Sequence, residues 1–413
     1  MGELEGGREA PPSSMAELEG GREAPPSSIV RLTRRAEPPG FTMTEVDDAV
    51  GDRLKALEDF TLADLDALRL ILRGGSVIDW RRLEFVAEDQ AREFLAVQEL
   101  NPDDPGDRTR MERVKTEAIA YLRRQFEYPI PRPVERASVL ELLVSASGRG
   151  HRAMCACTIL KCMHIIHHLD GRELSFVLPM PDQEVFHVVE EKVYRVIGSM
   201  LASGFPIIEF VGGRKNNDSV ITKLLSKPAT IAAQIFDKLR FRIVTRSRDD
   251  ILPILQYLTK KLFPFTYVVP GQSFNSVLSF RSYLEASPIG QLLPQLQDFG
   301  HGDADLPSTD NRYSDPEYST IHFVVDVPVR LPPAVLSRAP ASAASLGHIV
   351  FVICEFQIVD RDTDAHNELG DSSHSKYKER QKKAVMRRLQ LGGAVETPAA
   401  RSPRISERPR KRS

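Results

Sequence analysis

The hydrophobic pattern changes its period near residue 204, and this change constrains the fold more than any other feature of the sequence. Before it, apolar residues recur every three or four positions, as in amphipathic helices. After it, short runs rich in β-branched and aromatic residues alternate with helical segments. A chain of 413 residues is long enough for two domains, each with its own core. We therefore expect a mainly helical N-terminal domain followed by a domain that contains a sheet.

Four helical regions are expected in the first half of the chain. A stripe of apolar residues from Leu62 to Ile71 predicts an amphipathic helix, which would begin after Thr61 and end at Gly74 and Gly75. The other three helices are expected over about residues 108–126, 150–169 and 184–203. This half would therefore bury its apolar residues between helices.

The second half predicts an α+β domain with a five-stranded mixed sheet flanked by helices. The predicted strands are residues 205–211, 239–245, 265–269, 320–329 and 348–359. Helices are expected between the first three strands, over about 217–236 and 249–262. The segment 272–317 has no regular pattern, which would suit a substrate loop or a mobile lid.

Both ends of the chain differ in composition from a globular domain. Residues 1–14 return almost unchanged as residues 15–28, and their Gly, Glu, Pro and Ser cannot form a core. The last 34 residues are strongly basic and predict a short helix followed by a disordered tail. The expected organisation is a disordered tail at 1–43, a helical domain at 44–183, the sheet domain at 184–380, and a basic helix and tail at 381–413.

Composition excludes several classes of protein. The 55 basic and 57 acidic residues give a formal net charge of −2, which argues against a nucleic-acid binder that uses its whole surface, though not against a local basic pocket. No apolar run reaches the roughly 18–20 residues of a membrane span, and no secretion signal is visible. Four cysteines do not form a disulfide framework. We expect a protein of the reducing cytoplasm that does not bind a membrane.

The first candidate site follows the first predicted strand. Arg214 and Lys215 end that strand, and Lys215, Ser219 and Lys223 are spaced four apart, so they would share one face of the next helix. Two lysines beside a hydroxyl at a helix N-terminus suit the oxygens of a phosphate. The order of residues is not that of a Walker A loop. On spacing alone, a solvated basic face explains the same pattern more simply.

The second candidate site opens the second strand. Asp237 would be a suitable Mg²⁺ ligand, because hard cations prefer carboxylate oxygens. Arg240 and Arg242 alternate onto one face of the strand, where they could contact phosphate oxygens. An ordinary turn from helix to strand accounts for these residues equally well.

Two further candidate sites lie in the last two strands. Tyr318 could stack on a base, and His322 could donate to a phosphate or a ribose. Alternation places Glu355 and Gln357 on one face of a very apolar strand. If that face is buried, an ionised Glu355 needs a metal or another cation nearby. The alternatives are structural roles at strand ends and a half-exposed face of the sheet.

The order of the four sites resembles a known family. Along the chain the motifs are GRK-x3-Ser-x3-Lys, Asp-x4-Arg, Tyr-x3-His and Glu-x-Gln. This order is similar to that of the synthetase domain of RelA/SpoT enzymes, which make guanosine tetra- and pentaphosphate. The likeness continues through an acidic-Leu-Gly segment at 368–370 and HSKYK at 374–378, and it covers about residues 205–380.

The resemblance implies a nucleotidyltransferase-like fold and a GTP pyrophosphokinase-like activity. In this family, a Mg²⁺-dependent reaction transfers pyrophosphate from ATP to the ribose 3′-OH of a guanine nucleotide. By this resemblance the catalytic residues would be Asp237, Glu355 and Gln357. Asp237 would hold the Mg²⁺, and Glu355 would help to coordinate it or accept the proton of the attacking hydroxyl.

The resemblance also implies residues that bind the two substrates. The implied ATP-binding residues are Arg214 at the adenine and Lys215, Ser219, Lys223 and Arg242 at the phosphates. Tyr318 would stack on the base of the acceptor nucleotide. His322 and Gln357 would lie near the phosphates or the ribose of the same acceptor.

The sequence departs from the family where the acceptor would bind. Glu317 stands where the family usually has Gly before the motif tyrosine, and Val359 and Asp360 stand where basic residues are common. The acceptor therefore stays open between a guanine nucleotide, an adenine nucleotide and a tRNA 3′ end, which the basic tail would suit. An inactive nucleotide-binding regulatory module is a further alternative. The sequence also leaves a homo-oligomer open.

A group of histidines and cysteines in the third helical region has two interpretations. His151 and Cys155, like His164 and His168, are four residues apart, a spacing that can hold zinc. No CxxC pair is present, and apolar helices often contain cysteine. We favour a packed helix core here. Nor does the segment provide the adjacent His-Asp pair of the hydrolase domain in long RelA/SpoT enzymes.

Overall fold

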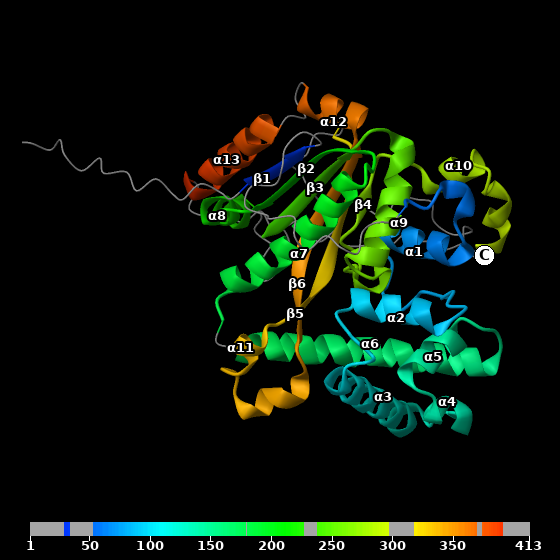
Figure 1. Ribbon diagram of the computed structural model, residues 1–413. Helices are drawn as coiled ribbons and strands as arrows, with labels where there is room; N and C mark the ends of the chain where they lie inside the picture. The colour runs from blue at the N-terminus through cyan, green and yellow to red at the C-terminus, as the bar shows by residue number, and fades with distance from the viewer. Residues whose placement is uncertain are drawn as a thin grey trace, which may run out of the picture.

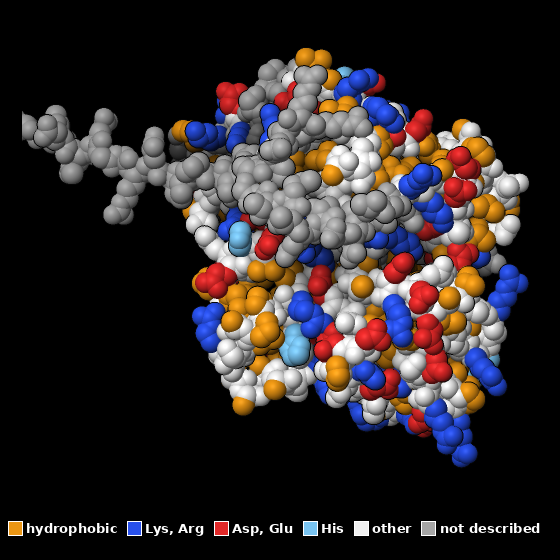
Figure 2. Space-filling model, viewed as in Figure 1, with side chains coloured by type: hydrophobic (Ala, Val, Ile, Leu, Met, Phe, Trp, Pro, Cys, Tyr) orange, Lys and Arg blue, Asp and Glu red, His pale blue; other side chains and the backbone are white. Residues whose placement is uncertain are grey.

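The computed structural model of the chain describes residues 29–33, 53–178, 180–226, 238–296, 318–369 and 374–390. Figure 1 shows a sheet with helices against it, standing on a separate layer of helices. None of the helices in these ranges is long and apolar enough to cross a membrane. Figure 2 shows acidic and basic side chains intermingled over the helical layer.

Within the described ranges the sheet has six strands in the order β1-β2-β3-β6-β5-β4. The strands are β1 (Ile29–Thr33), β2 (Ile207–Arg214), β3 (Leu239–Thr245), β4 (Phe274–Asn275), β5 (Ile321–Arg330) and β6 (Ile349–Asp360). Strands β3 and β6 are parallel, and the other neighbouring pairs are antiparallel. The expected α+β fold with a mixed sheet and flanking helices is confirmed. The predicted number of five strands is wrong by one.

The strand count differs because three segments were interpreted incorrectly. Residues 29–33, expected in the disordered tail, read IVRLT and pair with β2 as an edge strand. The short strand β4 lies in the segment that we expected to be irregular. Residues 265–269, expected as a strand, form a 3₁₀ turn at Phe265–Tyr267 with one isolated bridge between Val268 and Val325. Their apolar composition reflects burial instead of strand pairing.

One face of the sheet forms the larger hydrophobic core. Phe210, Phe241, Phe323 and Phe356 project from four adjacent strands and are fully buried. Helices α7 (Asp182–Ala202) and α9 (Ile251–Lys261) cover this face, as Figure 1 shows. The ring of Tyr194 on α7 contacts Phe210 and Phe241 edge-on, at 6.0 and 6.3 Å between centroids. The opposite face of the sheet is therefore the one that can carry polar side chains.

A second core joins the helices of the lower layer. These helices are α2 (Glu88–Val97), α3 (Pro105–Phe126), α4 (Arg132–Arg136), α5 (Val139–Ala146) and α6 (His151–Val177). Helix α6 also packs on β6, where Gly171 lies so close to Phe351 that a Cβ would come within 2.4 Å of its ring. The helical layer is thus attached directly to a central strand.

Helix α1 (Leu62–Arg73) packs mainly with the sheet, since Leu65 and Ile71 belong to the core beneath the strands, while its Leu70 packs against the core of the helical layer. Its predicted ends are confirmed. Thr61 forms a capping box with Asp64, and Gly74 ends the helix in the left-handed conformation at φ 62°.

The remaining elements border the sheet. Helix α8 (Asn217–Ser226) packs beside α13 (His374–Gln390), and Gln381 Nε2 donates to Ser226 Oγ at 3.1 Å. The short helices are α10 (Phe280–Glu285), α11 (Pro333–Leu336) and α12 (Arg361–Glu368), and the further 3₁₀ turns are Leu57–Asp59, Arg248–Asp250, Gly290–Gln295 and Ala341–Leu346. The predicted helix 217–236 is confirmed as far as residue 226, because 227–237 lie outside the described residues.

Candidate active site

Three adjacent strands bring polar side chains together on the face opposite the phenylalanines. In the register, Arg240 of β3 lies beside Glu355 of β6, and Arg242 lies beside Gln357. On the other side of β6, His322 of β5 lies beside Gln357. Neighbouring strands are about 4.8 Å apart, so these five side chains share one small area, which we call the polar face. Alternation predicted the shared face of the two arginines in β3 and that of Glu355 and Gln357 in β6, and the strand register brings these faces and His322 together.

Glu355 lies at the centre of the polar face. Its exposed fraction is 7%, and Gln357 Nε2 donates to its Oε1 at 2.6 Å. His322 Nε2 lies 3.6 Å from the same oxygen. Among the described residues, no lysine or arginine forms an ion pair with this carboxylate. A buried carboxylate in such surroundings favours a nearby cation, and its oxygen is the type of ligand that Mg²⁺ prefers.

The arginines of the polar face already have acidic neighbours. Arg242 forms an ion pair with Asp364 of α12, and its Nη1 lies 3.7 Å from Oε1 of Glu368. The Nε atom of Arg242 is buried and makes no hydrogen bond within the described part of the chain. An anion at this guanidinium would therefore find one unsatisfied donor. The sequence did not single out Asp364, whose partner is more than a hundred positions away.

Tyr318 is held next to the polar face by helix α12. The neighbouring Ser319 donates its backbone N–H to Asn367 Oδ1 at 3.0 Å, and Asn367 Nδ2 donates back to the carbonyl of Ser319 at 2.7 Å. Burial raises the pKa of Tyr318, while the nearby Arg242 and Arg240 act in the opposite direction. The phenol is thus neutral and lies within electrostatic range of both arginines.

The predicted phosphate-binding residues follow β2 into α8: Lys215 lies between the two elements, and Ser219 and Lys223 lie within the helix. The backbone N–H of Lys215 donates to the carbonyl of Lys238 at 2.9 Å, which fixes the start of α8 beside the start of β3. Asn216 Oδ1 accepts from the backbone N–H of Ser219 at 2.8 Å and satisfies the first turn of the helix. All three predicted residues are partly buried. Lys215 precedes the helix, whereas Ser219 lies in its first turn and Lys223 in its last, so the shared helix face of all three residues stays a prediction.

Arg214 is not brought to the polar face. It alternates with Gly213 and projects to the phenylalanine side, where its Nε and Nη2 donate to Glu190 of α7 at 2.9 and 2.6 Å. This bidentate contact raises the pKa of Arg214. The sequence does not single out Glu190, which is buried next to Val189 on an apolar helix face.

Asp237, the predicted Mg²⁺ ligand, lies outside the described residues, and so does Glu317. The described part of this site therefore contains Glu355 as its buried carboxylate. That Asp237 and Glu355 hold the same Mg²⁺ ion stays a prediction.

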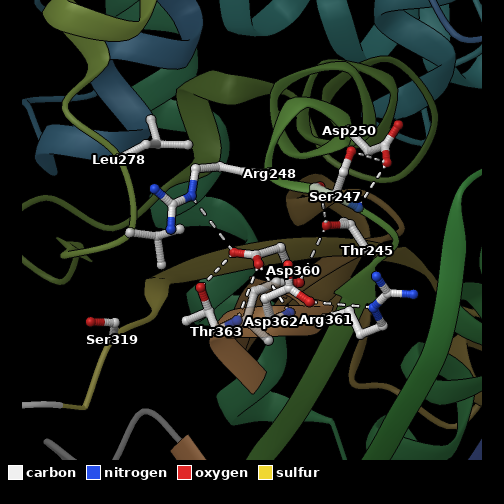
Figure 3. A network of polar contacts seen from close by, with 12 residues as sticks. Thr245, Ser247, Arg248, Asp250, Leu278, Ser319, Asp360, Arg361, Asp362 and Thr363 are labelled. Atoms are coloured by element: carbon white, nitrogen blue, oxygen red, sulfur yellow. Dashed lines mark hydrogen bonds and ion pairs between the residues drawn. The ribbon is translucent and has the colours of Figure 1, made fainter. Parts of the chain in front are cut away.

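Asp360, one of the departures from the family, has a structural role at the end of β6. Figure 3 shows its carboxylate surrounded by donors at the start of α12. Its Oδ1 accepts from the backbone N–H groups of Asp362 and Thr363 at 3.1 Å, and Thr363 Oγ1 donates to Oδ2 at 2.5 Å. Arg248 Nε lies 3.8 Å away. Burial alone would raise the pKa of Asp360, but the hydrogen bonds from Thr363 lower it.

The histidines of α6 pack between the helical layer and the sheet. The ring of His168 stacks on Phe351 at 4.0 Å and meets Tyr267 edge-on at 4.6 Å. Burial lowers the pKa of His167 to about 3 and that of His168 to about 4, so both are neutral near pH 7. Among the described residues, no three His, Cys, Asp or Glu side chains are grouped as a metal site would require.

The chain was compared with protein families, curated proteins and solved structures. No protein family and no curated protein matches the chain. Several solved structures do match. The matched proteins are alarmone synthetases and GTP pyrophosphokinase relatives. The order of motifs in the sequence resembles that of the same class of proteins.

The matches cover about half of this chain. Small alarmone synthetase 1 from Bacillus subtilis is 18% identical over 50% of this chain and 86% of its own, with a TM-score of 0.25. Small alarmone synthetase 2 from the same organism is 16% identical over 54% and 98%, with a TM-score of 0.26. A GTP pyrophosphokinase family protein from Streptococcus pneumoniae is 16% identical over 51% and 86%, with a TM-score of 0.27. Since these TM-scores are low, the functional argument depends on the side chains of the polar face.

Proposed function

We propose that this protein is a Mg²⁺-dependent enzyme that transfers pyrophosphate from ATP to the ribose 3′-OH of a guanine nucleotide. The observation that supports the proposal is the polar face itself. A buried carboxylate, Glu355, lies beside Arg240 of β3 in the register. The next residue on the same face of β6, Gln357, lies between Arg242 of β3 and His322 of β5. This is the combination of charges that a phosphate substrate and its metal ion need.

Transfer of a pyrophosphoryl group requires positioning and charge cancellation more than covalent help from the protein. The acceptor 3′-oxygen would attack the β-phosphorus of ATP, the bond from that phosphorus to the α-phosphate oxygen would break, and AMP would leave. Glu355 would accept the proton of the hydroxyl or hold the metal. When bound, Mg²⁺ would neutralise the phosphate oxygens. Asp237 would supply the second carboxylate.

The cations have separate tasks in this proposal. Lys215 before α8 and Ser219 and Lys223 within it would bind the phosphates of ATP. Arg242 would contribute its unsatisfied Nε, and would exchange part of its contact with Asp364 for phosphate. Arg214 would reach the adenine only after its two hydrogen bonds to Glu190 break.

The acceptor would bind on the side of β5. Tyr318 would stack on its base, and His322 and Gln357 would contact its ribose or phosphates. The small synthetase 1 structures of Bacillus subtilis were obtained with the product pppGpp and with AMPCPP, respectively. We propose the same two kinds of nucleotide here.

The proposal is tested by a transfer assay with the full chain, Mg²⁺ and ATP labelled at the γ-phosphate. GTP, GDP, ATP and deacylated tRNA serve as acceptors, and chromatography separates the products. We expect label on GTP or GDP, and loss of transfer when EDTA removes the metal. Label on tRNA or on a second ATP molecule would show that the acceptor is not a guanine nucleotide. ATP binding without any transfer would show a nucleotide-binding module instead of an enzyme.

A further inference from the structure

The helical layer contains a cavity that lies apart from the polar face. It is lined by residues of α2, α3, α5 and α6, which form the lower layer in Figure 1, and its volume is about 80 Å³. Protein interiors have few voids larger than one water molecule, and a water molecule takes up roughly 30 Å³ of the liquid. This space, which we call the helical cavity, is therefore larger than an ordinary packing defect and has room for a small molecule.

The wall of the helical cavity is mainly apolar. Most of the residues that line it have apolar side chains, among them Trp80, Met111, Val114, Val139 and Leu143. A water molecule inside a protein needs about two to four polar partners, and this wall offers few of them. The carbon atoms of an organic molecule would instead leave water and gain dispersion contacts. The wall thus favours an organic occupant over a cluster of waters.

Two residues of the wall carry buried polar atoms without partners. Arg110 Nε and His167 Nε2 make no hydrogen bond within the described part of the chain. The two side chains lie within electrostatic range of each other, because the charge of Arg110 contributes to the lowered pKa of His167. A buried polar group without a partner costs free energy. A ligand oxygen that bonds to either nitrogen would remove this cost.

The charge of Arg110 is already balanced. Its Nη2 forms an ion pair with Asp170 at 2.5 Å, and Arg113, which shares Asp170, has Glu117 as a second partner. Burial lowers the pKa of His167 to about 3, so its ring is neutral near pH 7. What remains is one N–H donor and one imidazole nitrogen that donates or accepts according to its tautomer. These groups suit a hydroxyl or a carbonyl and need no further anion.

The size of the helical cavity limits the ligand further. An engineered cavity of about 150 Å³ takes up benzene, so one of about 80 Å³ suits roughly three to five heavy atoms. We infer that the helical cavity binds a small uncharged organic molecule that has an apolar part and one hydroxyl or carbonyl oxygen. The oxygen would bond to Arg110 or His167, and the apolar part would pack against Val114, Val139 and Leu143.

Trp80 provides a local signal for binding, because it lines the helical cavity and is the only tryptophan in the sequence. Its side chain is buried and meets Phe265 edge-on at 6.5 Å between ring centroids. A ligand in the cavity would change the surroundings of the indole and therefore its emission. The polar face contains no tryptophan, so this signal does not depend on the proposed active site.

The test titrates the full chain with butan-2-ol, which has five heavy atoms, and records Trp80 fluorescence. We expect a saturable change. Propanoate has the same number of heavy atoms but carries a charge, so it should bind at least tenfold more weakly. A cavity that holds water only would give no saturable change with butan-2-ol. That result, or tighter binding of propanoate, would overturn the inference.

Cavity-filling variants localise the site. Val114→Ile/Val139→Ile adds a methyl group at two positions of the wall and should weaken butan-2-ol binding at least tenfold. Val144→Ile, in α5 but not in the lining of the cavity, is the matched control and should leave binding unchanged. If the double variant does not fold, Val114→Ile alone must still weaken binding at least threefold. An undiminished response in the filled variants would place the ligand elsewhere and contradict the inference.

A further variant tests the polar contact. His167→Phe keeps a ring of similar shape and removes its nitrogens. 2-Chlorobutane resembles butan-2-ol in size but makes no strong hydrogen bond, so the variant should lower the affinity for butan-2-ol relative to 2-chlorobutane at least fivefold. Arg110→Lys, which keeps the charge and removes Nε, replaces His167→Phe if that variant does not fold. An unchanged ratio of the two affinities would mean that the ligand oxygen does not contact these residues, against the inference.

Discussion

Glu355 is buried on a face that offers it a glutamine and a histidine as neighbours. We expect Glu355→Gln to reduce pyrophosphate transfer at least about 100-fold, because the variant can neither hold the metal nor accept a proton. The resistance to urea should not fall, since the change removes a buried charge and keeps the shape. Transfer assays and denaturation curves, compared with those of Glu184→Gln, an exposed glutamate of α7, check both parts. An active variant would remove Glu355 from the mechanism.

Asp326 lies four residues beyond His322 on the same side of β5, and burial raises its pKa to about 6. The folded state therefore binds this proton more tightly than the unfolded chain, whose pKa is close to 4. The stabilisation is fully present below about pH 4 and is lost as the pH rises through about 6.

Asp326→Asn should accordingly be more stable than the parent protein at pH 7.5, by at most about 2–3 kcal/mol, and the difference should shrink towards pH 4.5. Urea denaturation at both pH values measures it, with the exposed Asp182→Asn as the control. A difference that does not change with pH would mean that Asp326 does not titrate in this range.

Individual residues also show where sequence reasoning succeeds. Arg240 and Arg242, like Glu355 and Gln357, could be assigned to common faces because alternation is a local property of a strand. The same rule, applied from Lys215 back through Gly213, places Arg214 on the opposite face, where the structure has it. Its partner Glu190 could not be foreseen, since no local pattern links a helix to a strand 24 residues later.

Among the elements, α12 has a clear effect on the candidate site. It supplies Asp364 to Arg242 and Asn367 to the residue after Tyr318. Asp360 begins the helix by accepting from Asp362 and Thr363. We expect Asp360→Ala to lower the free energy of unfolding by about 1–2 kcal/mol. The KM for the acceptor should rise as well, because Tyr318 loses its support.

The exposed Asp362→Ala in the same turn is the matched control for this change, and it should alter neither quantity beyond about 0.5 kcal/mol. Urea denaturation and initial rates at varied acceptor concentration measure both. Equal effects of the two variants would mean that the cap does not hold α12 in place.

Most long elements follow from the sequence, whereas the short ones do not. Helix α1, which ends at Gly74, has a capping box and a left-handed terminal glycine. Residues next to its ends are therefore enough to predict where it begins and stops. Strand β1 depends on pairing with β2, which lies about 180 residues away, and its five residues carry too weak a pattern alone. The strand predicted at residues 265–269 is wrong for the opposite reason. Its residues are apolar because they are buried, and this composition resembles that of a strand.

At the scale of the whole molecule, the boundary between the expected domains is less sharp than the sequence indicates. Helix α1 shares the core of the sheet although it precedes the helical layer in the chain. Phe351 of β6 packs against the helical layer, and α6 touches that strand at Gly171. A sequence shows where the hydrophobic period changes, but it does not show which separated segments share a core.

This arrangement predicts opposite effects for two glycines inside helices. A Cβ on Gly171 of α6 would lie 2.4 Å from the ring of Phe351 and 3.0 Å from the carbonyl of Ile349, whereas a Cβ on Gly198 of α7 would meet nothing within 4 Å. Gly171→Ala should therefore destabilise the protein by about 1–3 kcal/mol through overpacking. Gly198→Ala should stabilise it by about 0.5–1 kcal/mol through helix propensity.

Thermal and urea denaturation of both variants, followed by circular dichroism and by Trp80 fluorescence, measure this difference. Because Trp80 belongs to the helical core and most strands to the other core, a single transition seen by both probes is expected for the parent protein. In Gly171→Ala the two probes should still coincide, at lower denaturant. If Gly171→Ala instead unfolded the helical layer alone, or stabilised the protein as Gly198→Ala does, α6 would not be the element that joins the two cores.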